Sequence, residues 1–199
     1  IRQSNTGESF FLLVDCFDPH EPFDPPPQYA DMYVDEDAPR NPWPTYGSSD
    51  GYSTAELDAI RGLYAGEVSM VDHWIGHVTD TLDELGLTSS TLVMLISDHG
   101  HLFGEHGLIG KPWKSDPTLY DELSRIPLII VDPTNDGQPE RRADLVQPVD
   151  VMPTILDWFG LPPRANAHGH SLLVSGPALS APREYAFFGR FGESINVTD

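Results

Sequence analysis

The residues from Ser53 to Gly86 constrain the fold of this chain more than any other part of the sequence. Their apolar side chains recur in steps of three and four, which places one stripe on a helix of roughly 33 residues. Ser53 and Glu56 form a capping-box pattern, and Gly86 can adopt the left-handed conformation that ends a helix. Glycines at 62 and 66 leave room for a break. The stripe consists of Leu57, Ile60, Tyr64, Val68, Val71, Ile75, Val78, Leu82 and Leu85.

Short apolar runs on both sides of this helix predict strands. They are rich in strand-forming residues and suit a sheet that is buried on both faces. A second helix is expected from Asp150, as its cap, to Trp158. Strands that alternate with helices predict an α/β fold with a mostly parallel sheet sandwiched by helices, which binds ligands at the carboxyl ends of its strands. The predicted strands are 10–16, 91–97 and 127–131, with weaker candidates at 145–149 and 184–188.

The charge of the chain bears on its partners. The formal net charge is −20, from 31 acidic and 11 basic residues, which argues against a nucleic-acid partner. An anionic substrate remains compatible, because a metal ion or a few local cations can reverse the field within one pocket. The sequence has no apolar run long enough for a membrane span. The single cysteine, Cys16, lies in the first apolar run and is expected to be a small buried residue.

Titratable residues are concentrated where the 91–97 strand should end. Asp98 and His99 follow it directly, and in a turn their side chains can converge on one divalent cation such as Ca²⁺, Mg²⁺ or Mn²⁺. The alternative is an Asx-turn beside a solvated histidine. Lys111 could neutralise an oxyanion, or it could be a solvated loop lysine. The glycines between them allow the backbone to approach an ion or a ligand closely.

A second candidate lies in the proline-rich, acidic stretch 17–44, which predicts a long surface loop without a regular element. His20 stands just after the predicted strand 10–16, and prolines on both sides stiffen the chain there. A histidine near a metal and a lysine is a plausible general acid for a leaving group. The alternative is an ordinary surface histidine.

Five segments together resemble the sulfatase family of the alkaline-phosphatase-like superfamily. They cover nearly the whole chain in the right order. The segments are SDHGHLFGEHGLIGK (97–111) with YDELSRIPLII (120–130), FFLLVDCFDPHEPF (10–23), AGEVSMVDHWIGHVTDTLDELGL (65–87), VQPVDVMPTILDWFGLPP (146–163) and HGHSLL (168–173).

The resemblance implies roles for four residues. Asp98 and His99 match the family's metal-binding pair, which usually holds calcium, with magnesium and manganese as alternatives. Lys111 matches the lysine that binds the sulfate oxygens. His20 matches the histidine that contacts the sulfate and is proposed to protonate the leaving oxygen. The resemblance gives no direct role to His101, Glu105 and His106.

The chain also departs from the family pattern. The family's nucleophile is a formylglycine made within a Cys-x-Pro-Ser-Arg motif, whereas Cys16 is followed by Phe-Asp-Pro. The early acidic metal ligands are absent as well. We therefore expect residues 1–199 to be a partial sulfatase catalytic domain, with the nucleophile upstream and the small C-terminal subdomain missing. The isolated segment is expected to be inactive.

The resemblance implies hydrolysis of sulfate esters by the full-length protein, on a small-molecule or carbohydrate substrate. The remainder of its own catalytic domain is then a partner of this segment. Two alternatives stay open: a phosphonate or phosphate ester hydrolase of the same superfamily, which needs much the same metal and cations, and a non-catalytic truncated member.

Overall fold

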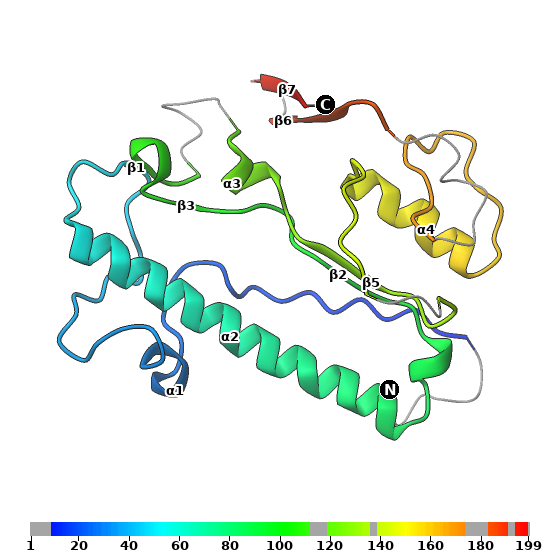
Figure 1. The fold of residues 1–199 in the computed structure, drawn as a ribbon, viewed down its shortest axis with the longest axis horizontal. Coiled ribbons are helices and arrows are strands. Elements are labelled where there is room, and N and C mark those ends of the chain that lie inside the picture. Colours follow the sequence, from blue (N-terminus) through cyan, green and yellow to red (C-terminus); the bar gives the residue numbers. More distant parts are fainter. Residues whose placement is uncertain (1–8, 112–118, 136–138, 174–182, 191–193, 199) are drawn as a thin grey trace. The chain divides into compact units, whose positions relative to one another are not determined.

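The computed structural model describes residues 9–111, 119–135, 139–173, 183–190 and 194–198 (Figure 1). These residues fall into two compact units. The first contains the described residues up to Thr88 together with 101–111. The second contains 89–100 and the described residues from 119 onward. No helix in the described parts of either unit has the length and apolar character needed to cross a membrane.

The long helix predicted from the sequence is present in the first unit as α2, Thr54–Glu84 (31 residues; Figure 1). Both halves of its capping box form: Ser53 Oγ accepts a hydrogen bond from the Glu56 amide at 3.3 Å, and the Ser53 amide donates to Glu56 Oε2 at 2.8 Å. At the other end Gly86 has φ 66°, and the Leu87 amide bonds back to the Leu82 carbonyl at 2.9 Å. Local signals therefore set both ends of α2.

The glycines within α2 do not break it. They allow the loop that precedes the helix to pack closely against it. A β-carbon on Gly62 would lie 2.9 Å from the Tyr33 carbonyl oxygen, and one on Gly66 would lie 2.9 Å from Pro25 Cγ. Close approach of this loop therefore requires glycine at both positions. The loop contains a short helix, α1 (Pro27–Ala30), where no regular element was expected. The resulting core consists of Phe23, Ala30, Val34, Ala59, Ile60, Leu63, Phe103 and Ile109.

A small antiparallel sheet completes the first unit. Its strands are β1 (Gly47–Ser48), β4 (Leu108–Gly110) and β3 (Leu102–Phe103), in that order. A 3₁₀ turn, η2 (Glu105–Gly107), connects β3 and β4. Leu102 and Ile109 are fully buried. The glycine-rich run 97–111, which the sequence presented as a loop, is therefore largely a hairpin.

The predicted strand 10–16 is wrong for this structure. Residues 9–17 form no strand, and apolar side chains such as Phe11 (63% exposed) and Leu13 (75% exposed) face solvent. Cys16 is exposed rather than buried. The segment has the apolar composition of a strand. A strand also needs a neighbouring strand for its backbone hydrogen bonds, and no described residue pairs with this segment.

The second unit corrects the direction of the predicted sheet. Strands β2 (Val93–Ile96) and β5 (Leu128–Val131) form close to where they were expected, but they pair antiparallel, with Val93 opposite Val131. All strand pairs among the described residues are antiparallel, so the mostly parallel sheet between helices is not seen there. A parallel pair needs a crossover, usually a helix. The described helix between β2 and β5 is only α3, Asp121–Ser124.

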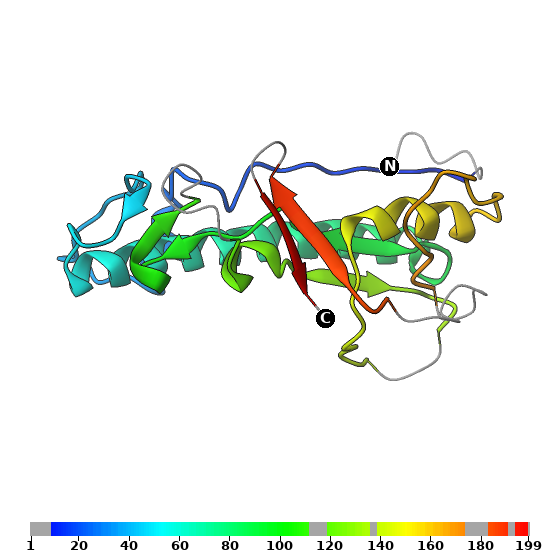
Figure 2. The same cartoon turned by 90° about the horizontal axis from the view of Figure 1, so that it is seen from above.

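The end of the second unit follows the prediction in part. Helix α4 (Val151–Trp158) is present, but η3 (Pro148–Asp150) replaces the predicted strand at 145–149. The Asp150 carboxylate does not cap α4, because backbone amides outside that helix and Arg183 occupy it. The last predicted strand is β6 (Ala186–Arg190), two residues later than expected, and it pairs antiparallel with β7 (Ser194–Thr198; Figure 2). A further 3₁₀ turn, η1, covers Thr88–Ser90.

Candidate active site

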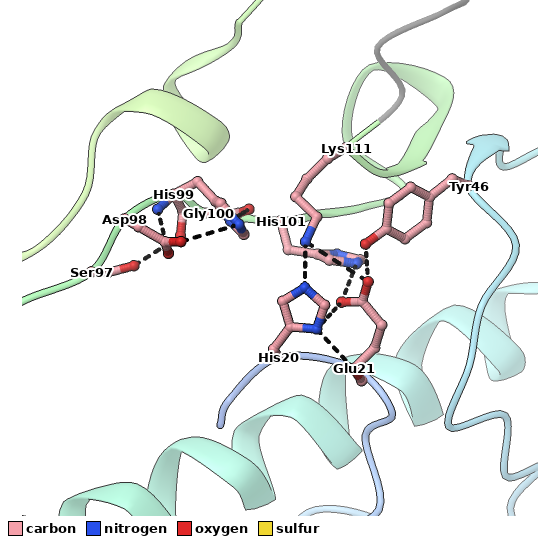
Figure 3. A network of polar contacts seen from close by, with 9 residues as sticks. All are labelled: His20, Glu21, Tyr46, Ser97, Asp98, His99, Gly100, His101 and Lys111. Atoms are coloured by element: carbon pink, nitrogen blue, oxygen red, sulfur yellow. Dashed lines mark hydrogen bonds and ion pairs between the residues drawn. The ribbon is translucent and has the colours of Figure 1, made fainter. Parts of the chain in front are cut away.

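Lys111 and His20 meet in the first unit although 91 residues separate them (Figure 3). Lys111 directly follows β4, and His20 lies in the loop between Pro19 and Pro22. Lys111 Nζ is 3.0 Å from His20 Nε2, so the ammonium group donates a hydrogen bond to the imidazole. The sequence singled out these two residues separately, and the structure brings them together.

A buried carboxylate lies beside this pair. Glu21 is 4% exposed, and its Oε1 is 3.7 Å from Lys111 Nζ while its Oε2 is 3.5 Å from His20 Nδ1. Tyr46 donates its hydroxyl hydrogen to Oε1 of the same carboxylate. The Lys111 ammonium also lies over the Tyr46 ring, 5.5 Å from its centroid. Lys111 therefore contacts an imidazole, a buried carboxylate and an aromatic ring.

Sequence reasoning did not single out Glu21, and it did not predict the contact between Glu21 and Tyr46. Glu21 could have been noticed, since it is the acidic residue next to His20 in a Pro-His-Glu-Pro segment that holds the backbone still. Tyr46 carries no such local signal, because it reaches Glu21 across 25 residues through the fold.

His101 closes the far side of Glu21. Its Nε2 is 3.8 Å from Glu21 Oε2, and its ring packs on Phe23 and Phe103 with centroid distances of 5.3 and 4.5 Å. Burial lowers the pKa of His101 to about 4, against the opposing effect of the Glu21 charge. His101 is therefore neutral near pH 7.

Glu67 of α2 is a second buried acid in this unit. It is 2% exposed, and its Oε2 has no hydrogen-bond partner among the described residues. Burial, followed by the charge of Asp18, raises the pKa of Glu67 to about 7, and a hydrogen bond from the Asp24 backbone opposes the shift. Glu67 thus titrates in the physiological range.

Asp98 and His99 lie together in the second unit, directly after β2 (Figure 3). Asp98 Oδ1 accepts a hydrogen bond from the amide of the next residue, His99, at 2.9 Å. His99 Nε2 lies 3.6 Å from Asp98 Oδ2. The side chains are 86% and 41% exposed, so a ligand can reach both.

The backbone at Gly100 positions this pair. The Gly100 amide bonds to the Leu123 carbonyl at 2.9 Å, and a β-carbon at position 100 would lie 1.8 Å from the Glu122 carbonyl oxygen. Only glycine can therefore occupy this place against α3. Ser97 Oγ bonds to the His99 carbonyl at 2.8 Å and fixes the turn from the other side.

The donor atoms of this pair are compatible with a divalent cation. His99 Nδ1 lies 3.0 Å from the Gly100 carbonyl oxygen, which holds the ring N–H and leaves Nε2 on the side of the Asp98 carboxylate. Metal-binding histidines commonly donate their second N–H to a carbonyl in this way. Within the described ranges no group of three or more histidine, cysteine or acidic side chains could hold a metal. Asp98 and His99 are thus part of a coordination sphere at most.

Comparison with protein families gives the context of these two clusters. The family model described as Sulfatase matches residues 1–161. The chain belongs to the sulfatase family. The match includes both clusters, α2, the hairpin and all of α4, and it confirms the resemblance stated from the sequence motifs.

Curated relatives of this sulfatase chain include an arylsulfatase of Clostridium perfringens, 29% identical over 86% of the chain and 38% of the relative. The multifunctional alkaline phosphatase superfamily protein PehA of Trinickia caryophylli is 32% identical over 84% of the chain and 37% of the relative. The chain therefore spans less than two fifths of the length of these relatives.

A solved structure supports the fold of the sulfatase chain. The phosphonate monoester hydrolase of Agrobacterium radiobacter superposes with a TM-score of 0.59 at 31% identity, over 71% of this chain and 28% of that one. The fold is accordingly that of sulfatases and phosphonate hydrolases of the alkaline-phosphatase-like type.

Proposed function

We propose that the complete protein hydrolyses sulfate esters and that this segment supplies Lys111, His20 and part of the metal site. Family membership supports the reaction class. The observation that carries the assignment of residues is the 3.0 Å contact between Lys111 Nζ and His20 Nε2. An ammonium group beside an imidazole suits an anionic ester whose leaving oxygen needs a proton.

Lys111 binds oxygens of the sulfate group in this proposal and stabilises the charge on them during transfer. His20 acts as the general acid. When the S–O bond to the leaving group breaks, the electron pair stays on the leaving oxygen, which takes the proton from His20 Nε2. His20 then becomes a neutral imidazole that retains its hydrogen on Nδ1.

Asp98 and His99 would hold the divalent metal, for which calcium is the first candidate and magnesium and manganese are alternatives. When bound, the metal supplies positive charge that polarises the ester. The nucleophile, a formylglycine by family resemblance, is expected upstream of these 199 residues. Cys16 does not fit that role, since it lacks the motif, and its Sγ donates a hydrogen bond to the backbone carbonyl of Asp18 at 3.5 Å.

The remainder of the catalytic domain is thus proposed as the partner of this segment. The substrate is proposed to be a small-molecule or carbohydrate sulfate ester. The isolated segment is expected to be inactive, because its sequence lacks the nucleophile motif and its described residues provide no group of three metal ligands.

Hydrolysis of a phosphonate or phosphate ester is the second candidate. It is favoured by the structural likeness to phosphonate monoester hydrolases, two of which superpose at 31% and 32% identity. Sulfate and phosphonate monoesters are both tetrahedral anions, and a metal with Lys111 would suit either. A non-catalytic role is disfavoured because Asp98, His99, Lys111 and His20, which match the family's functional positions, are all retained.

The test compares both ester classes on the complete protein. Release of 4-nitrophenol from its sulfate and from a phenylphosphonate monoester is measured at equal concentrations. The proposal expects the higher kcat/KM with the sulfate, and at least a ~100-fold loss in Lys111→Met and in His20→Gln. Arg61→Gln, which removes a half-exposed cation of α2, serves as the charge control and should retain activity. A higher kcat/KM with the phosphonate would replace the first candidate with the second.

A further inference from the structure

Glu21 is the anion that contacts both members of the proposed catalytic pair. Its two carboxylate oxygens divide between them: Oε1 lies 3.7 Å from Lys111 Nζ, and Oε2 lies 3.5 Å from His20 Nδ1 (Figure 3). The Tyr46 hydroxyl fixes the carboxylate by donating to Oε1. The carboxylate is almost fully buried, so water screens its charge weakly.

The hydrogen bonds of His20 show which of its two ring nitrogens carries a hydrogen. His20 Nδ1 lies 2.8 Å from the Glu21 backbone carbonyl oxygen, and only an N–H can bond to a carbonyl. His20 Nε2 accordingly accepts from Lys111 in this arrangement. This is the form that the imidazole has after it has given its proton to a leaving group.

To donate again, His20 must take up a proton on Nε2 within 3.0 Å of an ammonium group. Two adjacent positive charges repel, and the repulsion is large where water is excluded. A carboxylate in contact with both groups offsets it. Glu21 is placed for this effect, because one of its carboxylate oxygens lies near His20 and the other lies near Lys111.

We propose that Glu21 is a positioning residue that permits His20 to carry its proton beside a charged Lys111. This inference rests on the proposed function, because it assumes that His20 protonates the leaving oxygen. Glu21 itself contacts no reacting atom in this proposal. It acts through its charge and through the Tyr46 hydrogen bond that holds its carboxylate in place.

A purely structural role for Glu21 is the competing explanation. The carboxylate could simply match the charge of a mostly buried Lys111, whose side chain is 16% exposed. The two roles differ in one measurable respect. A structural role affects all substrates equally, whereas support of a general acid matters most when the leaving group is strongly basic.

The experiment measures kcat/KM of the complete protein for two aryl sulfates, 4-nitrophenyl sulfate and phenyl sulfate, whose leaving phenolate is more basic. The variant is Glu21→Gln, which keeps the shape and removes the charge. His20→Gln defines the loss that accompanies removal of the acid. Glu105→Gln removes one negative charge elsewhere in the same unit and is the matched control. If the wild type turns over phosphonates instead, the corresponding pair of phosphonate monoesters is used.

The quantity compared is the ratio of the two kcat/KM values for each variant. A misfolded fraction lowers both values equally, so the ratio remains valid even if Glu21→Gln folds poorly. We expect the phenyl ester to lose about tenfold or more beyond the loss of the nitrophenyl ester in both Glu21→Gln and His20→Gln. Glu105→Gln should leave the ratio unchanged.

Two outcomes overturn the inference, and they are distinguishable. If His20→Gln shifts the ratio and Glu21→Gln does not, His20 is the acid without help from Glu21, and the proposed function stands. If His20→Gln leaves the ratio unchanged, the general-acid role of His20 fails, and the inference fails with it. Absence of turnover of either ester class by the wild type would instead contradict the proposed function itself.

Discussion

Arg183 holds Asp150 with two parallel hydrogen bonds, at 2.7 Å from Nη1 to Oδ2 and at 2.8 Å from Nη2 to Oδ1. Asp150 is 1% exposed, and it also accepts hydrogen bonds from the amides of Gln147 and His170. This carboxylate therefore connects three parts of the second unit. They are the start of η3 at Gln147, the segment that contains His170, and Arg183, which precedes β6.

Replacement of Arg183 by methionine should destabilise the chain strongly. The change leaves a buried carboxylate without its cation, for which the expected cost is about 3 kcal/mol in the free energy of unfolding. Arg142→Met is the control. Arg142 and Asp144 form a partly exposed ion pair at 3.0 Å, which should contribute less than about 1 kcal/mol to the free energy of unfolding. Urea unfolding measures both, and equal losses would contradict the role given to Asp150.

The same contact predicts an acid dependence. Burial alone would raise the pKa of Asp150, but the hydrogen bonds from Arg183, Gln147 and His170 together outweigh it and lower that pKa. A depressed carboxyl pKa stabilises the fold above the unfolded-state value and loses this contribution as the pH falls. Arg183→Met should therefore flatten the acid side of the stability profile.

Glu67 predicts a dependence of the opposite sign. Its pKa rises from 4.5 to about 7, chiefly through burial, so the folded state holds this proton where the unfolded state releases it. Stability is full below about pH 4.5 and declines as the pH rises through 7, by on the order of 3 kcal/mol. Glu67→Gln should remove that decline, whereas exposed Glu36→Gln should leave it. Urea unfolding at pH 5 and pH 8 measures this decline in each protein. Equal declines in the wild type and in Glu67→Gln would refute the assignment to Glu67.

Alanine at position 100 should damage the turn that carries His99. Its β-carbon would lie 1.8 Å from the Glu122 carbonyl oxygen, so α3 or the turn must move, at roughly 1–3 kcal/mol. Gly76→Ala provides a control that should increase stability. No atom lies within 4 Å of a β-carbon at this position, and alanine favours a helix over glycine by about 1 kcal/mol. Thermal unfolding of the two variants tests the contrast; a tolerated alanine at 100 would show that the close approach is not rigid.

Asp98→Ala should separate activity from stability. The side chain is 86% exposed, so the free energy of unfolding should change by less than about 0.5 kcal/mol. Metal-supported turnover of the complete protein should be lost, and calorimetry should show weaker calcium binding. Asp144→Ala, another surface acid of the same unit, is the control. Near-native turnover in Asp98→Ala would remove this residue from the metal site.

The parts of the fold that the sequence predicted correctly are those with local causes. The stripe, the Ser53–Glu56 box and Gly86 all act within a few residues of α2, and its ends are nearly as expected. The pairing of β2 with β5 depends instead on residues more than 30 positions apart, so its antiparallel direction had no local signature. Residues 10–16 have the composition of a strand, and composition cannot supply a partner.

The candidate site shows the same division. Asp98, His99, Lys111 and His20 were singled out by residue type, position and motif, and each role stays a prediction. The distance between Lys111 and His20 comes from the hairpin and the loop together, which no single segment encodes. The contact of Tyr46 with Glu21 was not predicted for the same reason.

Gly62 and Gly66 divide the loop after His20 into two parts with different freedom to change. The stretch from Pro25 to Val34 lies against these glycines, so its backbone is held by the helix surface. Residues 35–37 are exposed just beyond it. Substitutions at 35–37 should be tolerated without displacing His20. A side chain at either glycine would instead collide with the loop. The acceptable sequence of this loop is therefore limited by two helix positions that carry no side chain at all.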